Sequence, residues 1–374
     1  MATGTGKGRG AEARVGALYE ALEHYLTGPA LFDATAVTQA DCLEIARGPL
    51  SSDLAVALLA RRPTQRLACH SYRSLTEERA VLVPVFLSAP WYVESHAGHL
   101  REKASDTCDY GELMRYSCNS GSAIGVTAAE ALLHALNEVI ERDAFSLLLA
   151  RSFLGEGATR LTVIDPATLP SGLARAFTAC ERLTNSQVHL LDITTNLGVP
   201  TMLAYSPPTA GRPHRRGVGT SLSSTHAAWR ALTEFLQISL GEESSPPSRS
   251  PHAHLTGLVA YPALFACGRF DLTDHLRTAW TMPFIPTGSA SGPPHVQLQE
   301  VIATLTSHRY PLYHRTVAIL PGEITAVHAI VPGLERFMIV TEGNLVIPGP
   351  RGRAAARESQ NLTVARRDPA QPQH

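Results

Sequence analysis

Length, composition and charge place this chain among globular proteins and exclude several functions. It has 374 residues, of which 44% are hydrophobic, so it can bury the core of one large domain or of two smaller ones. Its 32 basic and 33 acidic residues give a formal charge of −1, which argues against broad binding to nucleic acid or to a membrane surface. No apolar run approaches the roughly 20 residues needed to span a bilayer.

The N-terminus and the cysteines bear on the compartment. The first ten residues, MATGTGKGRG, include basic residues but no apolar segment, so we expect no secretory signal peptide. The six cysteines are scattered and form no CxxC pair, which indicates neither a zinc site nor a disulfide framework. We therefore expect a cytoplasmic protein.

The first part of the chain alternates helical patterns with short strand patterns. Helical patterns cover 11–26 and the alanine- and leucine-rich segment 30–65, with a break near Gly48. Strand patterns cover 66–71 and 80–87, and Pro84 favours an edge or a bulge in the second of them. The polar segment 88–118 is expected to be irregular.

The rest of the chain interleaves further helices and strands. In order, we expect a helix that continues through 145–154, a loop at 162–169, a helix at 173–182, strands at 188–194 and 201–205, a basic turn at 212–216, a helix at 223–240, a Pro/Ser linker at 241–256, a helix at 295–307, and strands at 312–319 and 324–331. Because no regular βαβ rhythm appears, the expected class is α+β (mixed α/β). We expect one domain at 1–350 and a mobile tail at 351–374.

The most informative stretch is 119–144, where a glycine-bearing loop runs into a strongly periodic helix. Glu138 and Glu141 lie three residues apart and therefore project from one face, with Arg142 beside them. Two adjacent carboxylates repel each other unless a cation or a hydrogen-bond donor lies between them. The apolar residues of this helix explain its packing, but they do not explain the acidic pair.

The same pattern occurs in three helices. Each reads Ala-Leu-x-Glu-x-x-(Glu or Gln) after a glycine-bearing loop, and the polar residues are Glu20 and Glu23, Glu138 and Glu141, and Glu234 and Gln237. Because Ala-Leu-x-Glu is also ordinary helix-forming sequence, the pattern by itself leaves two interpretations open. If the acidic faces converge, five carboxylates would require divalent cations such as Mg²⁺, which usually binds together with substrate phosphates.

The N-terminal GTGKG is similar to a phosphate loop in composition only. A Walker motif needs four residues between its first glycine and Gly-Lys, then Ser or Thr, and a strand in front. Here Gly8 follows Lys7 and no strand precedes the loop. A flexible basic terminus is the plainer interpretation, although Lys7 can still contact a phosphate.

These segments resemble the YcaO-domain family. NSGSAIG followed by HALNEVIERDA is similar to the family's central signature, GKG with ALYEALEHY to its first ATP-binding element, and GVGTS with RALTEFLQ to its third. The segments LDITTNLGVPTMLAY and VPGLE also match, so the resemblance extends from about residue 6 to about residue 350. It implies a YcaO-like fold whose ATP site is formed by acidic helices.

The resemblance implies ATP and Mg²⁺ as cofactors and assigns their ligands. It places Glu20, Glu23, Glu138 and Glu141 on the metal, Lys7 and Arg142 at phosphates, Glu234 and Gln237 in the nucleotide pocket, and Asn119 and Ser120 in the loop leading to that pocket. Many members phosphorylate a backbone amide oxygen of a ribosomally made peptide, after which a nucleophile adds to the amide carbon and phosphate leaves. A Cys, Ser or Thr side chain then yields an azoline, and a sulfur donor yields a thioamide.

We therefore expect a cyclodehydratase that modifies a precursor peptide delivered by a separate leader-binding partner of E1-like (ThiF-like) type. One alternative is thioamide formation with a TfuA-like partner. The other is a non-catalytic subunit that keeps the YcaO fold. A homodimer would fit the family.

The chain departs from the family pattern at several positions. Gly16 and His24 stand where the first element usually has Ser and Arg, and Ser239 lies where the third element often continues to an arginine. Family members normally carry a longer segment before the first element, so the N-terminus is expected to be short. The ending DPAQPQH lacks the Pro-x-Pro-x-Pro spacing that is frequent in azoline-forming members. These departures favour the two alternatives, thioamide formation and a non-catalytic subunit. They bear less on ATP binding.

Overall fold

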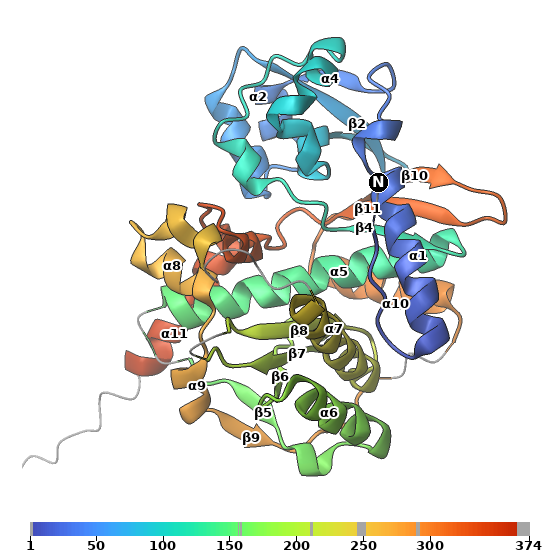
Figure 1. Ribbon diagram of the computed structural model, residues 1–374. Coiled ribbons are helices and arrows are strands. Elements are labelled where there is room, and N and C mark those ends of the chain that lie inside the picture. The colour runs from blue at the N-terminus through green and yellow to red at the C-terminus, as the bar shows by residue number, and fades with distance from the viewer. Residues whose placement is uncertain are drawn as a thin grey trace, which may run out of the picture.

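Two sheets and a long helix between them organise the computed structural model, which describes residues 3–155, 157, 159–209, 212–244, 252–288 and 292–364. The helix is α5 (Ala128–Leu149), which runs across the middle of the molecule (Figure 1). One half of α5 packs on a sheet that includes the late strand β11 (Thr325–Ile330), and the other half packs on the second sheet. This arrangement confirms the α+β class expected from the sequence.

The first sheet is fully antiparallel and has six strands. Their order is β1 (Thr38–Asp41), β2 (Arg66–Ser74), β10 (Tyr313–Ile319), β11 and β4 (Ser122–Gly125), with β3 (Ala80–Pro84) also paired to β2. The prediction of helix throughout 30–65 is wrong at β1, which pairs with β2 so that Thr38 lies opposite Cys69. Pairing with a distant strand has overridden local helix preference there. Short helices α2 (Cys42–Arg47) and α3 (Leu54–Ala57) follow.

The second sheet has five strands. Their order is β8 (Arg215–Thr220), β7 (Thr201–Ser206), β6 (His189–Asp192), β5 (Thr162–Ile164) and β9 (Trp280–Met282), and the β5–β9 pair is parallel. The predicted loop at 162–169 is wrong at β5, which pairs with β6 and β9. The predicted basic turn at 212–216 ends earlier, because Arg215 already belongs to β8.

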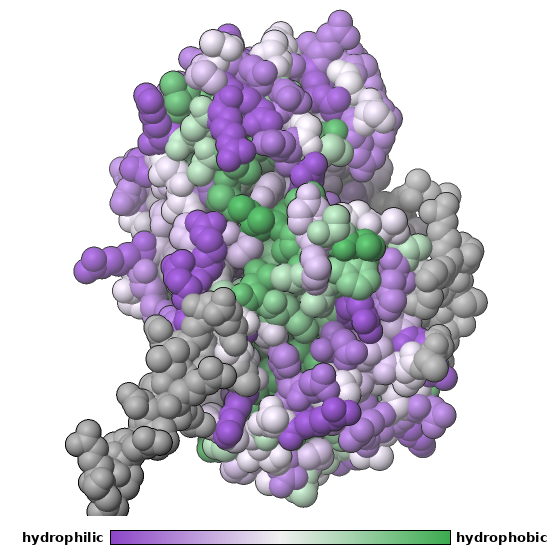
Figure 2. All heavy atoms as spheres, turned by 90° about the vertical axis from the view of Figure 1, so that its left-hand side faces the viewer, coloured by the Kyte–Doolittle hydropathy of each residue, from purple (hydrophilic) through white to green (hydrophobic). Residues whose placement is uncertain are grey.

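Helices cover both faces of the second sheet. One face is covered by α6 (Ser171–Thr184) and α7 (Ser224–Ser244), whose Phe177 and Phe235 pack in a core with Leu190 of the sheet. The other face packs against α5 and α8 (Pro262–Arg269). On the side of the molecule shown in Figure 2, hydrophobic residues gather in the middle and hydrophilic residues dominate above and below.

The remaining elements complete the boundaries. They are the helices α1 (Gly10–Leu26), α4 (Gly98–Lys103), α9 (Thr273–Arg277) and α10 (Pro294–Ser307), the 3₁₀ turns Pro29–Leu31, Leu58–Arg61, Val85–Leu87, Pro90–Val93, Ser95–Ala97, Leu113–Tyr116, Pro166–Thr168, Ala253–Leu258 and Phe337–Glu342, and a π turn at Ala150–Leu154. The helices predicted at 11–26, 173–182, 223–240 and 295–307 are therefore confirmed. No helix within the described ranges is long and apolar enough to cross a bilayer.

Local chemistry explains where α5 begins. The Thr127 hydroxyl accepts the Glu130 backbone N–H at 3.2 Å, and the Glu130 carboxylate accepts the Val126 N–H at 3.1 Å, which caps the helix. In the loop before β4, Gly121 has φ +92, and a Cβ there would lie 2.1 Å from the carbonyl oxygen of Ala329. This left-handed, tightly packed position requires glycine.

The expected mobile tail from residue 351 is wrong in its first part, because Pro350–Val364 forms helix α11. Arg351 bonds through Nε and Nη2 to Asp143 at 2.9 Å each, and Asp143 is completely buried on α5. The Glu335 carboxylate accepts the backbone N–H groups of Gly349 and Gly352 at 3.0 and 2.7 Å, which places an anion at the positive end of α11. Residues 365–374 of the expected tail lie outside the described residues.

Candidate functional site

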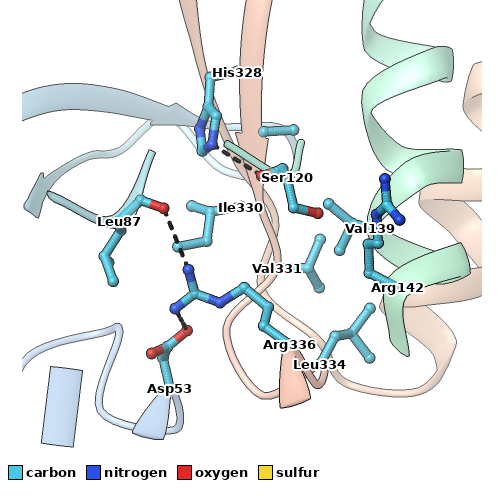
Figure 3. A pocket seen from close by; sticks show the side chains of 11 residues that line it. Asp53, Leu87, Ser120, Val139, Arg142, His328, Ile330, Val331, Leu334 and Arg336 are labelled. Carbon is cyan, nitrogen blue, oxygen red and sulfur yellow. Dashed lines mark hydrogen bonds and ion pairs between the residues drawn. The ribbon is translucent and has the colours of Figure 1, made fainter. Parts of the chain in front are cut away.

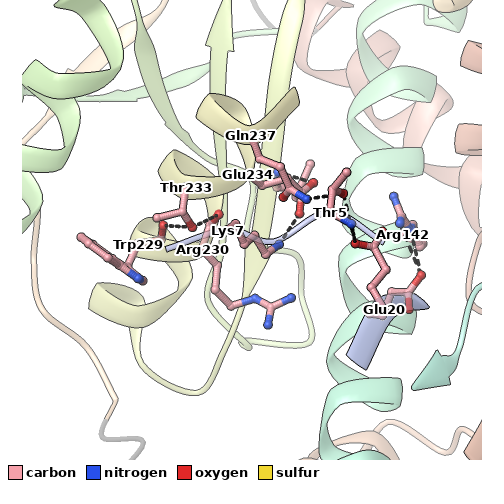
Figure 4. A network of polar contacts seen from close by, with 11 residues as sticks. Thr5, Lys7, Glu20, Arg142, Trp229, Arg230, Thr233, Glu234 and Gln237 are labelled. Carbon is pink, nitrogen blue, oxygen red and sulfur yellow. Dashed lines mark hydrogen bonds and ion pairs between the residues drawn. The ribbon is translucent and has the colours of Figure 1, made fainter. Parts of the chain in front are cut away.

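The three helices that share the acidic pattern meet beside the N-terminal segment. Thr5 joins two of them: its backbone N–H and its hydroxyl donate to Glu20 Oε2 on α1 at 2.6 and 3.0 Å. Its hydroxyl also accepts from Gln237 Nε2 on α7 at 2.6 Å (Figure 4). The convergence that the sequence left open is therefore present, and Thr5 is a bridging residue that the pattern did not identify.

Lys7 lies at the centre of this contact between helices. Its Nζ is 2.5 Å from Glu234 Oε2 on α7, and the Val218 backbone N–H donates to the other carboxylate oxygen at 3.3 Å. Burial opposes ionisation of Glu234, but the charge and hydrogen bond of Lys7 together with the charges of Arg142 and Arg230 outweigh it, so the pKa of Glu234 is lowered. Gly6 allows this placement, because a Cβ there would lie 1.6 Å from the carbonyl oxygen of Ala13 on α1.

Glu141 is the most unusual carboxylate of the group. It is 4% exposed, and its Oε2 is buried without a hydrogen-bond partner among the described residues. Burial raises the pKa of Glu141, and the charge of Glu234 adds to the rise. A buried, unpaired carboxylate oxygen is costly, so it points to a cation or a donor that completes the site.

A second group of carboxylates gathers where α1 faces α5. Burial raises the pKa of Glu23 to about 8, and the charges of Glu138 and Glu20 contribute to that rise. Glu138 forms an ion pair with Arg142, one helical turn further along α5, with 3.3 Å between Glu138 Oε1 and Arg142 Nη2. These carboxylates repel one another, which is the electrostatic condition that a bound divalent cation relieves.

Arginine side chains balance part of this negative charge. Burial disfavours the charged form of Arg142, but Glu138, Glu141 and Glu234 outweigh it, so the pKa of Arg142 is raised. Arg230 lies one turn before Glu234 on α7, and its Nε is buried without a partner in the described part of the chain. Arg230 was not among the predicted site residues, although its i,i+4 spacing from Glu234 is a signal that could have identified it.

Ser120 lies in a separate pocket between α5, β11 and the lobe that carries Asp53 (Figure 3). Ser120 is 9% exposed and its carbonyl oxygen accepts from His328 Nε2 at 3.1 Å. Arg142 lines the same pocket, and so does Arg336, which bonds Asp53 at 2.7 Å. The pocket therefore connects Ser120 to the acidic cluster through Arg142.

Asn119 is not brought into either group. It is exposed, its carbonyl oxygen accepts the Ser122 N–H at 3.1 Å, and its side chain makes no hydrogen bond within the described ranges. Of the ten predicted site residues, the structure brings together Lys7 and those on α1, α5 and α7. Ser120 lines a neighbouring pocket that Arg142 also lines, and Asn119 lies apart from both.

The positions that depart from the family pattern lie around this cluster rather than within it. His24 Nδ1 is 3.2 Å from the Thr3 carbonyl oxygen, so it ties the N-terminal segment to α1. The Ser239 hydroxyl donates to the Phe235 carbonyl oxygen at 2.7 Å, and the residue is fully buried on α7. Gly16 is exposed on α1. The geometry thus explains how the three residues are accommodated.

The residues fit ATP and Mg²⁺ in charge and chemistry. They offer several carboxylates for a hard cation, one of them with a buried oxygen that no described residue bonds, and cationic side chains beside them for phosphates. No three acidic, histidine or cysteine side chains in the described parts of the chain are close enough to hold one metal ion as they stand. The fold and the cluster together define a protein whose acidic helices are suited to a metal–nucleotide complex.

Comparison with known proteins supports this class. The sequence matches the family described as "YcaO cyclodehydratase, ATP- and Mg²⁺-binding" over residues 5–335, so the chain belongs to the YcaO family. ATP and Mg²⁺ are the cofactors of this domain. The predicted family, fold and cofactors are confirmed.

Two relatives match parts of the chain. An uncharacterized protein of Methanothermobacter thermautotrophicus is 30% identical over 235 residues, which are 60% of this chain and 58% of that protein. An "uncharacterized protein in tfuA 3'region" of Rhizobium leguminosarum bv. trifolii is 34% identical over 129 residues, 32% of this chain and 30% of that protein. The chain thus spans less than two thirds of the relatives' length.

Solved structures share the fold at low sequence identity. YcaO from Methanopyrus kandleri, bound with AMPPCP and Mg²⁺, has a TM-score of 0.61 and 19% identity, and the match covers 89% of this chain and 79% of that one. A chain of the E. coli microcin synthetase McbBCD complex with pro-MccB17 bound has a TM-score of 0.59 and 12% identity, with 89% and 82% covered.

Proposed function

We propose that this chain activates peptide backbone amides by ATP-dependent O-phosphorylation and thereby cyclises Cys, Ser or Thr residues of a ribosomally made precursor peptide to azolines. The observation that carries the proposal is Glu141, whose buried carboxylate oxygen has no hydrogen-bond partner among the described residues and lies where three acidic helices of a YcaO-family chain converge. Such a carboxylate would destabilise an apolar contact between helices, but beside a cation its charge is compensated.

Bound ATP and Mg²⁺ would supply the phosphoryl group and neutralise its charge, since phosphoryl transfer depends on positioning and electrostatic stabilisation. In this proposal the metal ligands are Glu20, Glu23, Glu138 and Glu141, the phosphate contacts are Lys7 and Arg142, and Glu234, Gln237, Asn119 and Ser120 complete the nucleotide pocket.

The chain's own residues prepare this site before the nucleotide arrives. Lys7, Arg142 and Arg230 together keep Glu234 ionised, and Thr5 holds Glu20 and Gln237 in one arrangement. Glu23 carries a proton at neutral pH, because its pKa is about 8. A metal would displace that proton, so binding is expected to tighten as pH rises toward 8.

Calorimetric titration with Mg²⁺ and a non-hydrolysable ATP analogue tests the site directly. Glu138→Gln and Glu141→Gln each keep the side-chain volume but remove the charge, and we expect both to abolish Mg²⁺-dependent binding. Glu300→Gln, at an exposed position of α10, is the matched control and should bind as the wild type does. Unchanged binding in Glu138→Gln and Glu141→Gln would contradict the assignment of the site.

The reaction is tested by co-expressing the chain with a precursor peptide and the partner protein and measuring the mass of the peptide by mass spectrometry. Loss of one water per modified residue supports cyclodehydration. The alternative is thioamidation with a TfuA-like partner, which the name of the Rhizobium relative supports, and it predicts exchange of oxygen for sulfur. An unchanged peptide together with normal nucleotide binding supports the second alternative, a non-catalytic subunit.

A separate partner is part of the proposal. The E. coli microcin synthetase is a McbBCD complex seen with pro-MccB17 bound, which supports delivery of the peptide by another chain. We propose an E1-like (ThiF-like) leader-binding protein for cyclodehydration. Omitting that protein from the co-expression should abolish modification without affecting calorimetric binding of the nucleotide.

A further inference from the structure

Two cysteines that are far apart in the sequence meet in the lobe at the top of Figure 1. Cys42 is the first residue of α2, and Cys108 lies between α4 and the turn Leu113–Tyr116. Their Sγ atoms are 3.8 Å apart, within hydrogen-bond distance for sulfur, although 66 residues separate them in the chain. Neither cysteine belongs to a CxxC pair, so the contact is a product of the tertiary structure.

The backbone around both cysteines is held by the same residue. The Cys42 N–H donates to the Gln65 carbonyl oxygen at 3.0 Å, and Gln65 Oε1 accepts the Asp109 N–H at 2.8 Å. Asp106 Oδ1 accepts the Cys108 N–H at 3.0 Å from the other side. Because these bonds fix both stretches of backbone, the approach of the two sulfur atoms is a property of the fold.

The pair combines a buried sulfur with an accessible one. Cys42 is 0% exposed, whereas Cys108 is partly exposed. The hydrogen bond from Cys108 and the charge of Arg62 together outweigh burial and nearby carboxylates, so the pKa of Cys42 is lowered. A thiol that solvent reaches, next to one that forms a thiolate more readily than usual, is an arrangement from which a disulfide can form.

A metal site explains the two thiols less well. A structural zinc ion needs a full set of Cys, His or carboxylate ligands, and no three such side chains in the described parts of the chain are close enough to hold one ion. Cys69, on the neighbouring strand β2, is fully buried, and its thiol donates to the Leu67 carbonyl oxygen at 3.9 Å. The Asp106 carboxylate already accepts four hydrogen bonds, from the N–H groups of Ala68 and Cys108 and the hydroxyls of Tyr92 and Tyr110.

We propose that Cys42 and Cys108 are an oxidation site, at which a peroxide converts the two thiols to a reversible disulfide. The Sγ–Sγ bond forms as both thiol hydrogens leave, and the O–O bond of hydrogen peroxide breaks as it takes up two electrons and two protons and departs as two molecules of water. The sulfur atoms must approach from 3.8 Å to about 2 Å, and rotation about a Cα–Cβ bond moves a sulfur atom by more than this difference. A dithiol reverses the step by exchange.

The disulfide would fasten one part of the lobe to another. It closes a loop that contains β2, β3 and α4, and it ties α2 to the segment 106–118, which leads directly into the loop at Asn119 and Ser120. Closing a loop of this length restricts the unfolded chain and therefore stabilises the folded one. The inference needs neither nucleotide nor peptide, so its failure is distinct from a failure of the proposed function.

Peptide mapping tests the proposal on the purified chain. Hydrogen peroxide is added at a concentration equal to that of the protein, and the protein is then denatured and alkylated. We expect the peptides of Cys42 and Cys108 to be linked and the alkylated thiols to fall from six to four, with dithiothreitol restoring all six. In Cys108→Ser, Cys42 should stay alkylated. Cys180→Ser is the matched control and should still form the disulfide, since this buried cysteine donates only to the Leu232 carbonyl oxygen at 3.3 Å.

Urea unfolding of the same samples measures the effect of closing the loop. We expect the midpoint of the oxidised wild type to lie about 1 M above that of the reduced protein, and the midpoint of Cys108→Ser to be the same with and without peroxide. The mapping of the wild type requires no variant to fold. Full alkylation of Cys42 in the peroxide-treated wild type would overturn the proposal. So would accumulation of Cys108 as sulfinic acid instead of the disulfide, or equal midpoints for the oxidised and reduced wild type.

Discussion

Removing Arg351 tests the unexpected attachment of α11 to the central helix. The Arg351 side chain is 15% exposed and makes three bonds to the fully buried Asp143 carboxylate, at 2.9, 3.1 and 2.9 Å. Arg351→Met keeps most of the aliphatic stem but leaves Asp143 as a buried, uncompensated charge. Loss of one partner from a buried pair costs about 3–5 kcal/mol, and that is the expected decrease in the free energy of unfolding.

The pH dependence of this effect has a defined sign. Burial already raises the pKa of Asp143 against the opposing effect of Arg351, so removing Arg351 raises it further. A carboxyl whose pKa is raised in the folded state loses stability as pH increases. The difference between wild type and Arg351→Met should therefore be smaller near pH 5 than near pH 8.

Urea unfolding followed by tryptophan fluorescence measures both quantities. Arg357→Met, at an exposed position of the same helix, is the control and should stay within about 0.5 kcal/mol of wild type. Asp143→Asn combined with Arg351→Met should recover much of the loss, because the buried charge is gone while the amide oxygen can still accept the Glu335 N–H. A decrease below about 1 kcal/mol in Arg351→Met would refute the ion pair as the anchor of α11.

Three further predictions follow from local geometry. Glu23→Gln should flatten the dependence of the free energy of unfolding on pH between 4.5 and about 8. In that window, without Mg²⁺, the wild type loses stability as pH rises, because Glu23 ionises in the unfolded state but keeps its proton in the folded state. Equal slopes for both proteins would contradict the raised pKa of Glu23. Gly121→Ala should lower the free energy of unfolding in urea by about 1–3 kcal/mol or more, because the residue has φ +92 and a Cβ would meet the Ala329 carbonyl. A loss under about 0.5 kcal/mol would show that the loop relaxes. Thr127→Ala should cost about 1 kcal/mol and Thr127→Ser almost nothing in the same assay, and equal losses would rule out the hydroxyl cap of α5.

The elements that carry the candidate site could be predicted because their signals are local. Helices α1, α5 and α7 follow from apolar periodicity, and the repeated Ala-Leu-x-Glu pattern placed Glu20, Glu138 and Glu234 on helical faces. The spacing of two carboxylates on one face is likewise a property of the helix alone.

Other elements depend on partners that are distant in the chain. The three-residue strand β5 has no strong pattern of its own. It forms because it pairs with β6 and with β9, and β9 lies far along the chain, beginning at Trp280. Helix α11 has a polar sequence that reads as a tail, and its first turn is held by Asp143 and Glu335. Composition within a window carries no information about such contacts.

The sequence by itself determined the helices α1, α5 and α7, the mixed α/β class, the family and the residue types available to a metal–nucleotide complex. Only the tertiary structure decided that the three acidic faces meet, that Thr5 and Lys7 join them, and that Glu141 has a buried oxygen without a partner in the described part of the chain. It also decided that Val15, Leu18 and Tyr25 of α1 are exposed, whereas Leu22 and Leu26 pack inward. The physical reason is that periodicity fixes which residues share a face, whereas burial and charge pairing depend on what the rest of the chain places against that face.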